Sequence, residues 1–290
     1  MTIDIIIPTY NRNAILIEAL ESIQAQTYTH WHCWIAEDGE TQETFKAIQP
    51  FLEDDRFQYL PGKHSGTPAT PRNRAILQGN AQYIAFLDDD DLWLPEKLEK
   101  QIEFIKRHPG CALLACNAFT WSGTKNWNRS LPMYFQKPPL GKLKYEDLLW
   151  KSRLINSSVM IPRIVLKYSG LQNESLFSTP FGEDYELWLR IGALGEVWLM
   201  PDAYVVYREA ANSYTSKLSR QEKYQIAATV FDAALNGVEG IPSPLTYPEN
   251  KPYADACRRA RDFYRSGPRL LGKLRYRIAL AINKYASSRS

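Results

Sequence analysis

Four consecutive aspartates, residues 88–91, directly follow an apolar run at residues 83–87. Adjacent carboxylates repel one another unless a cation or firm hydrogen bonds neutralise them. Oxygen ligands of this kind suit Mg²⁺ or Mn²⁺, and Mg²⁺ typically binds one or two carboxylates while phosphates and water complete its shell. The run therefore predicts a site for a metal diphosphate. The alternative is that Asp91 caps the following helix and the other aspartates are solvated loop charges.

A second acidic pair, Glu183 and Asp184, opens a strongly apolar helical pattern at residues 183–193. Acidic residues in the first turn cap a helix and interact favourably with its dipole. The functional alternative is a general base for a hydroxyl group, with Tyr185 and Trp188 shaping a sugar-sized pocket and shielding the carboxylate from water. Spacing alone favours the capping interpretation.

Asp38 and Arg72 also have two interpretations each. Asp38 precedes Gly39, which is typical of a turn, but its carboxylate would also accept hydrogen bonds from a nucleobase. Arg72 opens a predicted helix after the glycine-containing loop at residues 61–71, where it would either bind a nucleotide or lie on the surface. Taken alone, the residues favour the turn for Asp38 and leave Arg72 undecided.

The elements that position these residues are predicted from hydrophobic periodicity. Short apolar runs alternate with helical patterns through the first hundred residues, which is the signature of βαβ units and a largely parallel sheet. The predicted strands are residues 3–7, 31–36, 57–60 and 83–87. The predicted helices are residues 14–26, 41–49, 72–78 and 95–107.

Polar groups follow three of these strands. In open α/β sheets, ligands bind outside the carboxyl ends of the strands, so residues far apart in the sequence would converge on one crevice. These groups are Thr9, Tyr10, Asn11 and Arg12 after the first strand, Glu37 and Asp38 after the second, and Asp88, Asp89, Asp90 and Asp91 after the fourth.

The pattern is less regular in the second half of the chain. Strands are expected at residues 112–116, 158–161, 197–200 and 204–207, helices at 183–193 and 219–235, and a hairpin or loop at 121–139. Four prolines predict a linker or a stiff crossing segment; these are Pro242, Pro244, Pro248 and Pro252.

The composition limits the class of protein. The 290 residues are 44% hydrophobic and 23% charged, which excludes disordered, collagen-like and coiled-coil chains. The net charge of +3 gives no indication of nucleic-acid binding. The four cysteines lack CxxC spacing and zinc-finger histidines, so we expect reduced, packed thiols. The N-terminus does not resemble a signal peptide, and no apolar run approaches the roughly 18 residues of a spanning helix, so a cytoplasmic protein is expected.

The C-terminal residues 258–290 contain ten Lys or Arg residues and one acidic residue, Asp262. From Leu271 onward, apolar residues recur at spacings of three or four and form one helical stripe, with basic residues gathered on another side. A basic amphipathic helix of this kind binds an anionic membrane surface. The alternative is that the apolar stripe packs on the rest of the chain or on a partner subunit.

Five segments together resemble, in order and spacing, the family 2 glycosyltransferases of the GT-A fold. The segments are IIIPTYNR at residues 5–12, EDG at 37–39, GTPATPRN at 66–73, FLDDDDLW at 86–93 and EDYELWL at 183–189. The resemblance extends from about Ile3 to about Tyr207. It implies an α/β GT-A fold with a Rossmann-like, mostly parallel central sheet flanked by helices, and a C-terminal helical extension.

The resemblance also implies a division of the chain. Residues 1–215 would form the catalytic domain, with a nucleotide-binding half at 1–110 and an acceptor-binding half at 111–215. Residues 216–290 would form the helical extension with its basic amphipathic tail.

The implied activity is that of an inverting transferase, which moves a sugar from a nucleoside diphosphate donor, usually UDP-linked, to an acceptor hydroxyl. A single sugar is expected because the Gln-x-x-Arg-Trp motif of processive relatives is missing. The acceptor would be a glycan or lipid-linked glycan in bacterial surface polysaccharide or lipopolysaccharide assembly. Residues 268–288 would then contact the inner face of the cell membrane. No oligomeric state is indicated.

Carried over position by position, the resemblance assigns a role to each candidate residue. Asp90 and Asp88 would hold Mn²⁺ or Mg²⁺, with Asp90 the direct ligand, and Asp184 would be the catalytic base. Glu183, Tyr185 and Trp188 would bind the acceptor. The donor nucleotide would be bound by Pro8, Thr9, Tyr10, Asn11, Arg12, Asp38, Arg72, Asp88 and Asp89.

Two other functions stay open. A catalytically silent subunit would bind a glycan or nucleotide within a membrane-associated complex, although retention of both acidic clusters argues against it. A nucleotidyltransferase that makes sugar nucleotides would carry a Gly-rich loop with Arg and Lys directly after the first strand, and residues 8–11 are not such a loop.

Overall fold

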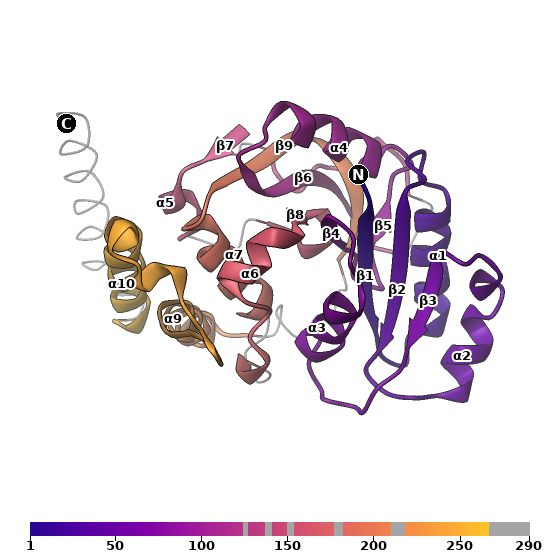
Figure 1. The fold of residues 1–290 in the computed structure, drawn as a ribbon, viewed down its shortest axis with the longest axis horizontal. Coiled ribbons are helices and arrows are strands. Elements are labelled where there is room, and N and C mark those ends of the chain that lie inside the picture. Colours follow the sequence, from indigo (N-terminus) through magenta and orange to yellow (C-terminus); the bar gives the residue numbers. More distant parts are fainter. Residues whose placement is uncertain (124–126, 137–140, 150–153, 177–181, 210–217, 267–290) are drawn as a thin grey trace.

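The structure is a computed structural model that describes residues 1–123, 127–136, 141–149, 154–176, 182–209 and 218–266. Within these residues the chain forms an α/β fold in which helices cover both faces of a curved, mostly parallel sheet (Figure 1). The main sheet has nine strands, in the order β3-β2-β1-β4-β8-β6-β9-β5, with β7 paired to β9. The predicted α/β architecture is confirmed.

The first half of the sheet contains four parallel strands. They are β1 (Ile3–Thr9), β2 (Trp31–Glu37), β3 (Phe57–Leu60) and β4 (Tyr83–Phe86). Ile3 pairs with Trp31 of β2 and with Tyr83 of β4. Every residue of β1 is buried, as expected for a parallel strand covered on both faces. The four predicted strands are therefore confirmed, and their carboxyl ends share one edge of the sheet.

Four helices belong to this half, and the sequence predicted each of them. They are α1 (Asn13–Gln24), α2 (Gln42–Ile48), α3 (Ala69–Gln78) and α4 (Lys97–Arg107). The predicted start of α3 at Arg72 is wrong, because the helix begins at Ala69 and includes Pro71. Proline fits there because the first-turn N–H groups have no partner within a helix.

Alternate residues of β1 point into two hydrophobic layers. Ile3, Ile5 and Ile7 pack with residues of α1 and α4, whereas Ile6 packs with residues of α3 and of the later helix α7 (Gly182–Gly192). This alternation follows from the period of two along a strand. The two layers fix the strand in the sheet and so fix the position of the residues that follow it.

The second half of the sheet is mixed. Its strands are β5 (Leu92–Trp93), β6 (Cys111–Trp121), β7 (Gly141–Leu143), β8 (Met160–Pro162) and β9 (Glu196–Arg208). β6 runs parallel to β9, whereas β8 is antiparallel to both β4 and β6. The prediction of two strands in place of β9 is wrong. A register shift between Cys116 and Asn117 of β6 takes up the residues around Pro201, so one strand continues through the proline.

The remaining helices are α5 (Tyr145–Leu148), α6 (Arg163–Ser169), α9 (Arg220–Asn236) and α10 (Lys251–Arg265). Of the two alternatives for the proline segment, the linker is wrong: β10 (Gly237–Val238) and β11 (Ile241–Pro242) form a short hairpin, two 3₁₀ turns follow, and Pro252 lies in the first turn of α10. α9 and α10 lie side by side (Figure 1), and they share one hydrophobic core with α7.

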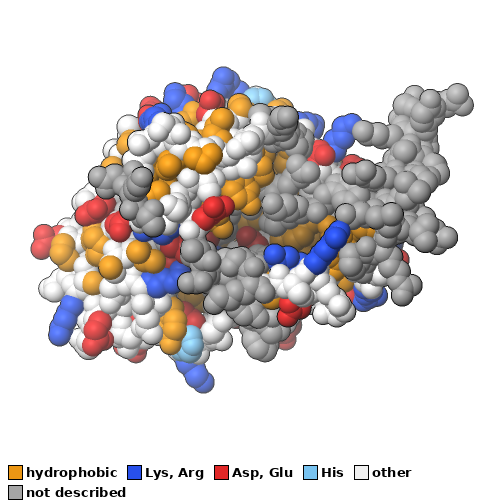
Figure 2. Space-filling view, turned by 180° about the vertical axis from the view of Figure 1, so that it is seen from behind, with side chains coloured by type: hydrophobic (Ala, Val, Ile, Leu, Met, Phe, Trp, Pro, Cys, Tyr) orange, Lys and Arg blue, Asp and Glu red, His pale blue; other side chains and the backbone are white. Residues whose placement is uncertain are grey.

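Several further expectations can be compared with the structure. All four cysteines are buried and none forms a disulfide, as predicted. Across the described ranges, no helix has both the length and the apolar character needed to cross a membrane. Figure 2 shows the reverse side of the molecule, where basic and acidic side chains are interspersed over the described surface. The predicted domain boundary at residue 215 and the predicted membrane-contact segment 268–288 lie outside the described residues.

Candidate active site

A cavity of about 560 Å³ opens at the carboxyl ends of β1, β2 and β4. This volume lies within the range of roughly 300–1,000 Å³ that is typical of small-molecule sites. All the residues expected to bind a donor nucleotide line it except Asn11, and Asp90 lines it too. The structure therefore brings together the polar groups of three strand ends, as their positions after the strands predicted.

Asn11 occupies the turn between β1 and α1. Its φ of 53° is the only positive value among the described non-glycine residues. Asparagine enters this left-handed region more readily than most residues do. Its side chain is exposed, while its neighbours Tyr10 and Arg12 both line the cavity. Asn11 is thus placed to shape the turn that presents its two neighbours.

Replacing Asn11 with alanine is expected to lower the free energy of unfolding by about 1 kcal/mol, because a side chain without a polar group resists the left-handed conformation. Glycine has no such penalty, so Asn11→Gly is expected to keep the wild-type value. Urea denaturation of both variants measures the difference. Equal losses in the two variants would show that the asparagine side chain matters and the backbone conformation does not.

Asp89 is buried in the floor of the cavity. It accepts hydrogen bonds from Thr9 Oγ1 at 2.8 Å and from Arg12 Nη1 at 3.1 Å. Burial raises the pKa of Asp89 to about 6, while the nearby Arg12 opposes this shift. Arg12 Nη1 also lies 3.0 Å from Asp90 Oδ2. One arginine therefore forms ion pairs with two neighbouring aspartates.

Asp91 has a different environment from the other three aspartates. It is buried and accepts hydrogen bonds from Ser157 Oγ at 2.5 Å and from the Arg208 backbone N–H at 2.9 Å. The alternative in which Asp91 caps the following helix is wrong, because α4 begins at Lys97 and its N-cap is Glu96. Asp91 instead connects the aspartate loop, residues 88–91, to β9 and to the 3₁₀ turn at Asn156–Ser158.

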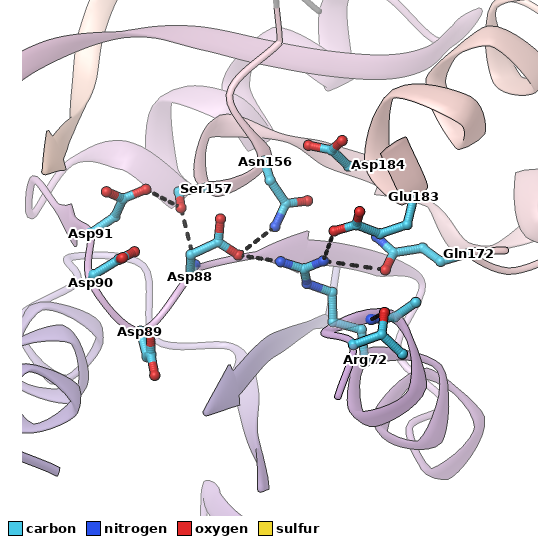
Figure 3. A network of polar contacts seen from close by, with 12 residues as sticks. Arg72, Asp88, Asp89, Asp90, Asp91, Asn156, Ser157, Gln172, Glu183 and Asp184 are labelled. Carbon is cyan, nitrogen blue, oxygen red and sulfur yellow. Dashed lines mark hydrogen bonds and ion pairs between the residues drawn. The ribbon is translucent and has the colours of Figure 1, made fainter. Parts of the chain in front are cut away.

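Arg72 joins the two acidic clusters (Figure 3). Its Nη2 donates to Asp88 Oδ1 at 2.5 Å, and its Nη1 donates to Glu183 Oε1 at 3.1 Å. Asn156 Nδ2 donates to the same Asp88 oxygen at 2.8 Å. Burial by itself would lower the pKa of Arg72, but the surrounding carboxylates, Asp88 first, raise it above its ordinary value. Arg72 is therefore a buried, charged residue that lines the cavity, and the alternative of a surface position is wrong.

Asp184 lies beside Glu183 in the first turn of α7 (Figure 3), where it accepts a hydrogen bond from the Tyr185 backbone N–H. Burial raises the pKa of Asp184 well above its ordinary value, and the charge of Glu183 adds to this, whereas Arg72 opposes it. A carboxylate with a raised pKa accepts a proton more readily and suits general-base chemistry. Asp184 thus combines the first-turn position of a capping residue with the basicity of a functional one.

Tyr185 and Trp188 do not line the cavity. The Tyr185 hydroxyl donates to the Leu148 carbonyl at 2.6 Å, and the Trp188 ring packs on Phe86. Both side chains are buried, Tyr185 against Phe231 of α9 and Trp188 against Phe86 of β4, so among the described residues they do not form the wall of a sugar-sized pocket as predicted. Glu183 is engaged by Arg72, which gives its carboxylate a partner within the protein.

Four residues of the site were not found by sequence reasoning. His64 lines the cavity, Asn156 and Ser157 bind the aspartate loop, and Arg208 Nε donates to the Asp90 carbonyl at 2.8 Å. The glycine-containing loop at residues 61–71 offered a signal for His64. Asn156 and Ser157 precede β8, so they follow no strand-end pattern, whereas Arg208 directly follows the predicted strand at 204–207 and was passed over.

The two residues expected from the sequence to hold a divalent cation are Asp88 and Asp90. Both carboxylates line the cavity, and their side chains are 30% and 32% exposed. Burial raises the pKa of Asp90, and the charge of Asp88 raises it further, a repulsion that a bound cation would relieve. Within the described part of the chain, no group of three or more His, Cys, Asp or Glu residues is arranged to hold a metal. The pair therefore fits an open site that phosphate oxygens and water would complete, as Mg²⁺ sites commonly are.

Comparison with known proteins places the chain among glycosyltransferases. The family model described as "Glycosyl transferase family 2" matches residues 4–167. An Escherichia coli protein named UDP-Glc:alpha-D-GlcNAc-diphosphoundecaprenol beta-1,3-glucosyltransferase WfgD is 28% identical over 228 residues, which are 77% of this chain and 83% of that protein. An uncharacterized glycosyltransferase of Rickettsia bellii is 38% identical over 106 residues, but these are 37% of this chain and only 15% of that protein.

Solved structures share the fold. Staphylococcus aureus TarS 1–349 in complex with UDP-GlcNAc has a TM-score of 0.64 at 17% identity, covering 91% of this chain and 81% of that one. The mannosyltransferase PcManGT from Pyrobaculum calidifontis, in complex with GDP-Man and Mn²⁺, has a TM-score of 0.60 at 16% identity, covering 99% of this chain and 81% of that one. These likenesses agree with the GT-A architecture expected from the sequence.

Proposed function

The chain belongs to glycosyl transferase family 2, and from that premise we propose that it moves one sugar from a nucleoside diphosphate donor to an acceptor hydroxyl, with inversion at the anomeric carbon. The observation that carries this proposal is a single cavity that combines aromatic rings, two arginines and two partly exposed aspartates at the strand ends. The aromatic rings would stack on a nucleobase, and the charged groups would bind a diphosphate and its metal ion.

Within this proposal, the charged end of the cavity binds the diphosphate. Arg72 and Arg12 supply the positive charge, and Asp88 and Asp90 hold Mn²⁺ or Mg²⁺. The bound cation would stabilise the negative charge that develops on the leaving diphosphate. The solved mannosyltransferase with Mn²⁺ supports divalent cation use. Since WfgD is named for a UDP-linked donor and TarS binds UDP-GlcNAc, we assign UDP as the nucleotide of this chain.

Asp184 acts as the general base. It takes the proton from the acceptor hydroxyl as the oxygen attacks the anomeric carbon from the face opposite the diphosphate. Glu183, whose carboxylate is 3.1 Å from Arg72, holds the arginine in place beside this base. An α-linked donor then gives a β-linked product, because the attack and the departure occur on opposite faces.

The acceptor is a glycan or a lipid-linked glycan in surface polysaccharide assembly. The name of WfgD includes a diphosphoundecaprenol acceptor, which supports a lipid-linked substrate for this chain. Residues 268–288 would hold the enzyme at the membrane where such an acceptor lies. Tyr185 and Trp188 take no part in acceptor binding in this proposal, since both are in the core.

The test is a panel of UDP-, GDP-, ADP- and dTDP-linked sugars with Mn²⁺, measuring release of the nucleoside diphosphate. UDP-linked sugars are expected to give release and the others none. Tight UDP binding with no release from any donor would contradict the enzyme proposal and favour the catalytically silent subunit.

In the pH profile of kcat, the midpoint of the fall at acid pH is expected above the ordinary Asp pKa of about 3.9, because burial and Glu183 raise the pKa of Asp184. The base works only when ionised, so kcat falls as the pH drops through this raised pKa. Measuring kcat at saturating donor and Mn²⁺ separates Asp184 from the aspartates that bind the cation. A midpoint at or below pH 4 would argue against Asp184 as the base. Asp184→Glu is expected to shift this midpoint.

A further inference from the structure

The hydroxyl group of Ser157 connects the two ends of the aspartate loop (Figure 3). Its Oγ accepts a hydrogen bond from the Asp88 backbone N–H at 3.0 Å and donates one to Asp91 Oδ2 at 2.5 Å. A serine hydroxyl has one donor and two acceptor sites, so it makes both bonds at once. One side chain therefore holds the residues that precede and follow Asp89 and Asp90.

The two residues expected to bind the cation belong to this anchored loop. Asp88 is held through its backbone N–H by Ser157 and through its carboxylate by Asn156 and Arg72. The charges of Asp88 and Asp90 repel each other. A small divalent cation such as Mg²⁺ demands near-ideal ligand geometry. We therefore expect the cation affinity to depend on the anchors that keep these carboxylates together.

The turn at Asn156–Ser158, which supplies the hydroxyl group, is buried and is held by side chains of β5 and α4. Trp93 Nε1 donates to the Ser157 carbonyl oxygen at 2.7 Å. Gln101 Nε2 donates to the Ser158 carbonyl oxygen at 2.8 Å. These hydrogen bonds fix the backbone of the turn and leave the Ser157 hydroxyl group free to bind the aspartate loop.

Lys97 is completely buried and orients one of these supporting side chains. Its Nζ donates to Gln101 Oε1 at 2.8 Å and lies 3.8 Å from the centre of the Trp93 ring. Burial lowers the pKa of Lys97 to about 7. Because an ammonium group only donates hydrogen bonds, the Gln101 amide must direct its oxygen to Lys97 and its nitrogen to the turn. The turn is therefore held in one orientation relative to the loop.

We propose that Ser157 is a positioning residue that sets the affinity of the aspartate loop for its divalent cation. Ser157 is completely buried and does not line the cavity, so it acts through Asp88 and Asp91 and touches no ligand. This inference rests on the proposed function, since Mn²⁺ and UDP are the ligands that it concerns.

The test is calorimetry of UDP binding with Mn²⁺ and with a chelator, which gives the gain in affinity due to the cation. Ser157→Ala is expected to reduce this gain about tenfold, within the range of about 10–100-fold for loss of a residue that supports a metal ligand. UDP affinity in the chelator is expected to keep its wild-type value. A higher Mn²⁺ concentration is expected to restore UDP affinity, because both carboxylates are still present.

Ser158→Ala is the matched control. Ser158 is equally buried in the same turn, but its hydroxyl group donates to the Ile155 carbonyl oxygen at 2.7 Å and not to the aspartate loop. Both variants are expected to lose similar stability in urea, whereas only Ser157→Ala is expected to lose affinity for Mn²⁺. An equal reduction of the Mn²⁺ gain in both variants would assign the effect to the integrity of the turn and would overturn the role of the Ser157 hydroxyl group.

The outcomes separate this inference from the proposed function. Wild-type protein that binds no UDP, or whose UDP affinity gains nothing from Mn²⁺, would overturn the proposed function and this inference with it. If wild type shows the gain and Ser157→Ala shows the same gain, or if saturating Mn²⁺ does not restore binding, only the role of Ser157 is overturned. Should Ser157→Ala fail to fold, Ser157→Cys decides the question, because a thiol is a weak hydrogen-bond donor and a wild-type gain in that variant would contradict the proposal.

Discussion

Replacing Asp184 with asparagine is expected to lower the rate of sugar transfer by about 10²–10⁴-fold, the usual contribution of a general base. The variant keeps the size of the side chain and removes the proton acceptor. Affinity for UDP with Mn²⁺ is expected to stay at the wild-type value, because Asp184 does not line the cavity that binds the donor. The measurements are kcat under saturating donor and acceptor, and UDP affinity by calorimetry.

Stability provides a second measurement for the same variant. The pKa of Asp184 is raised in the folded protein, so this residue costs stability at neutral pH. The cost declines as the pH falls below the raised pKa and is absent below the ordinary Asp pKa of about 3.9. Asp184→Asn is therefore expected to unfold at a higher urea concentration than wild type while losing activity. If Asp184 served only as a helix cap, the variant would lose stability and keep its rate. Asp202→Asn, at an exposed position on β9, is the control for removing a carboxylate.

Asp90→Asn is expected to reduce turnover by roughly 10³-fold, because stabilisation of the leaving group by a cation contributes several kcal/mol. It is also expected to abolish the gain in UDP affinity that Mn²⁺ gives to wild type. Arg12 keeps its contact with Asp89, 3.1 Å away, so the fold of the loop does not depend on Asp90 alone.

Calorimetry of UDP binding with Mn²⁺ and with a chelator, in wild type and in Asp90→Asn, measures this effect without turnover. Glu21→Gln, at an exposed position on α1, is the control for loss of one negative charge. Full activity and an undiminished Mn²⁺ effect in Asp90→Asn would contradict the assignment of Asp90 as a metal ligand.

The parallel half of the fold could be predicted because each of its features depends on local sequence. β1, β2 and β4 are short, mostly buried apolar runs, and the polar residues after them mark the strand ends. Strand topology then brings Thr9, Asp38 and Asp88 to one cavity. Here a one-dimensional pattern was sufficient, since parallel strands place their carboxyl ends together.

Strands in the mixed half were predicted near β6, β8 and β9, but the pairing of these strands could not be predicted in the same way. The turn with Asn156 and Ser157 reaches the aspartate loop only because β8 inserts between β4 and β6. Arg208 reaches it from the end of β9, which continues through Pro201 because extra residues of β9 are taken up by a register shift in its pairing with β6. The positions of these residues depend on pairing between strands that are distant in the sequence. Hydrophobic periodicity along the chain does not predict such pairing.

The error over Tyr185 and Trp188 has a similar cause. An aromatic residue in an apolar helix can either line a sugar-binding pocket or pack in the hydrophobic core. The choice depends on what covers the helix, and the Tyr185 ring packs against Phe231 of α9. The helix at residues 219–235 was predicted, but the sequence pattern does not indicate that it packs on α7.

The most direct test of the account is proton NMR of the first sugar released from an α-linked UDP-sugar in the presence of Mn²⁺, with water as the nucleophile. The account predicts that UDP appears only with the cation and that the sugar is released first as the β-anomer. Initial release of the α-anomer would contradict the inverting mechanism, and the absence of Mn²⁺-dependent UDP release from any UDP-sugar would contradict the proposed activity.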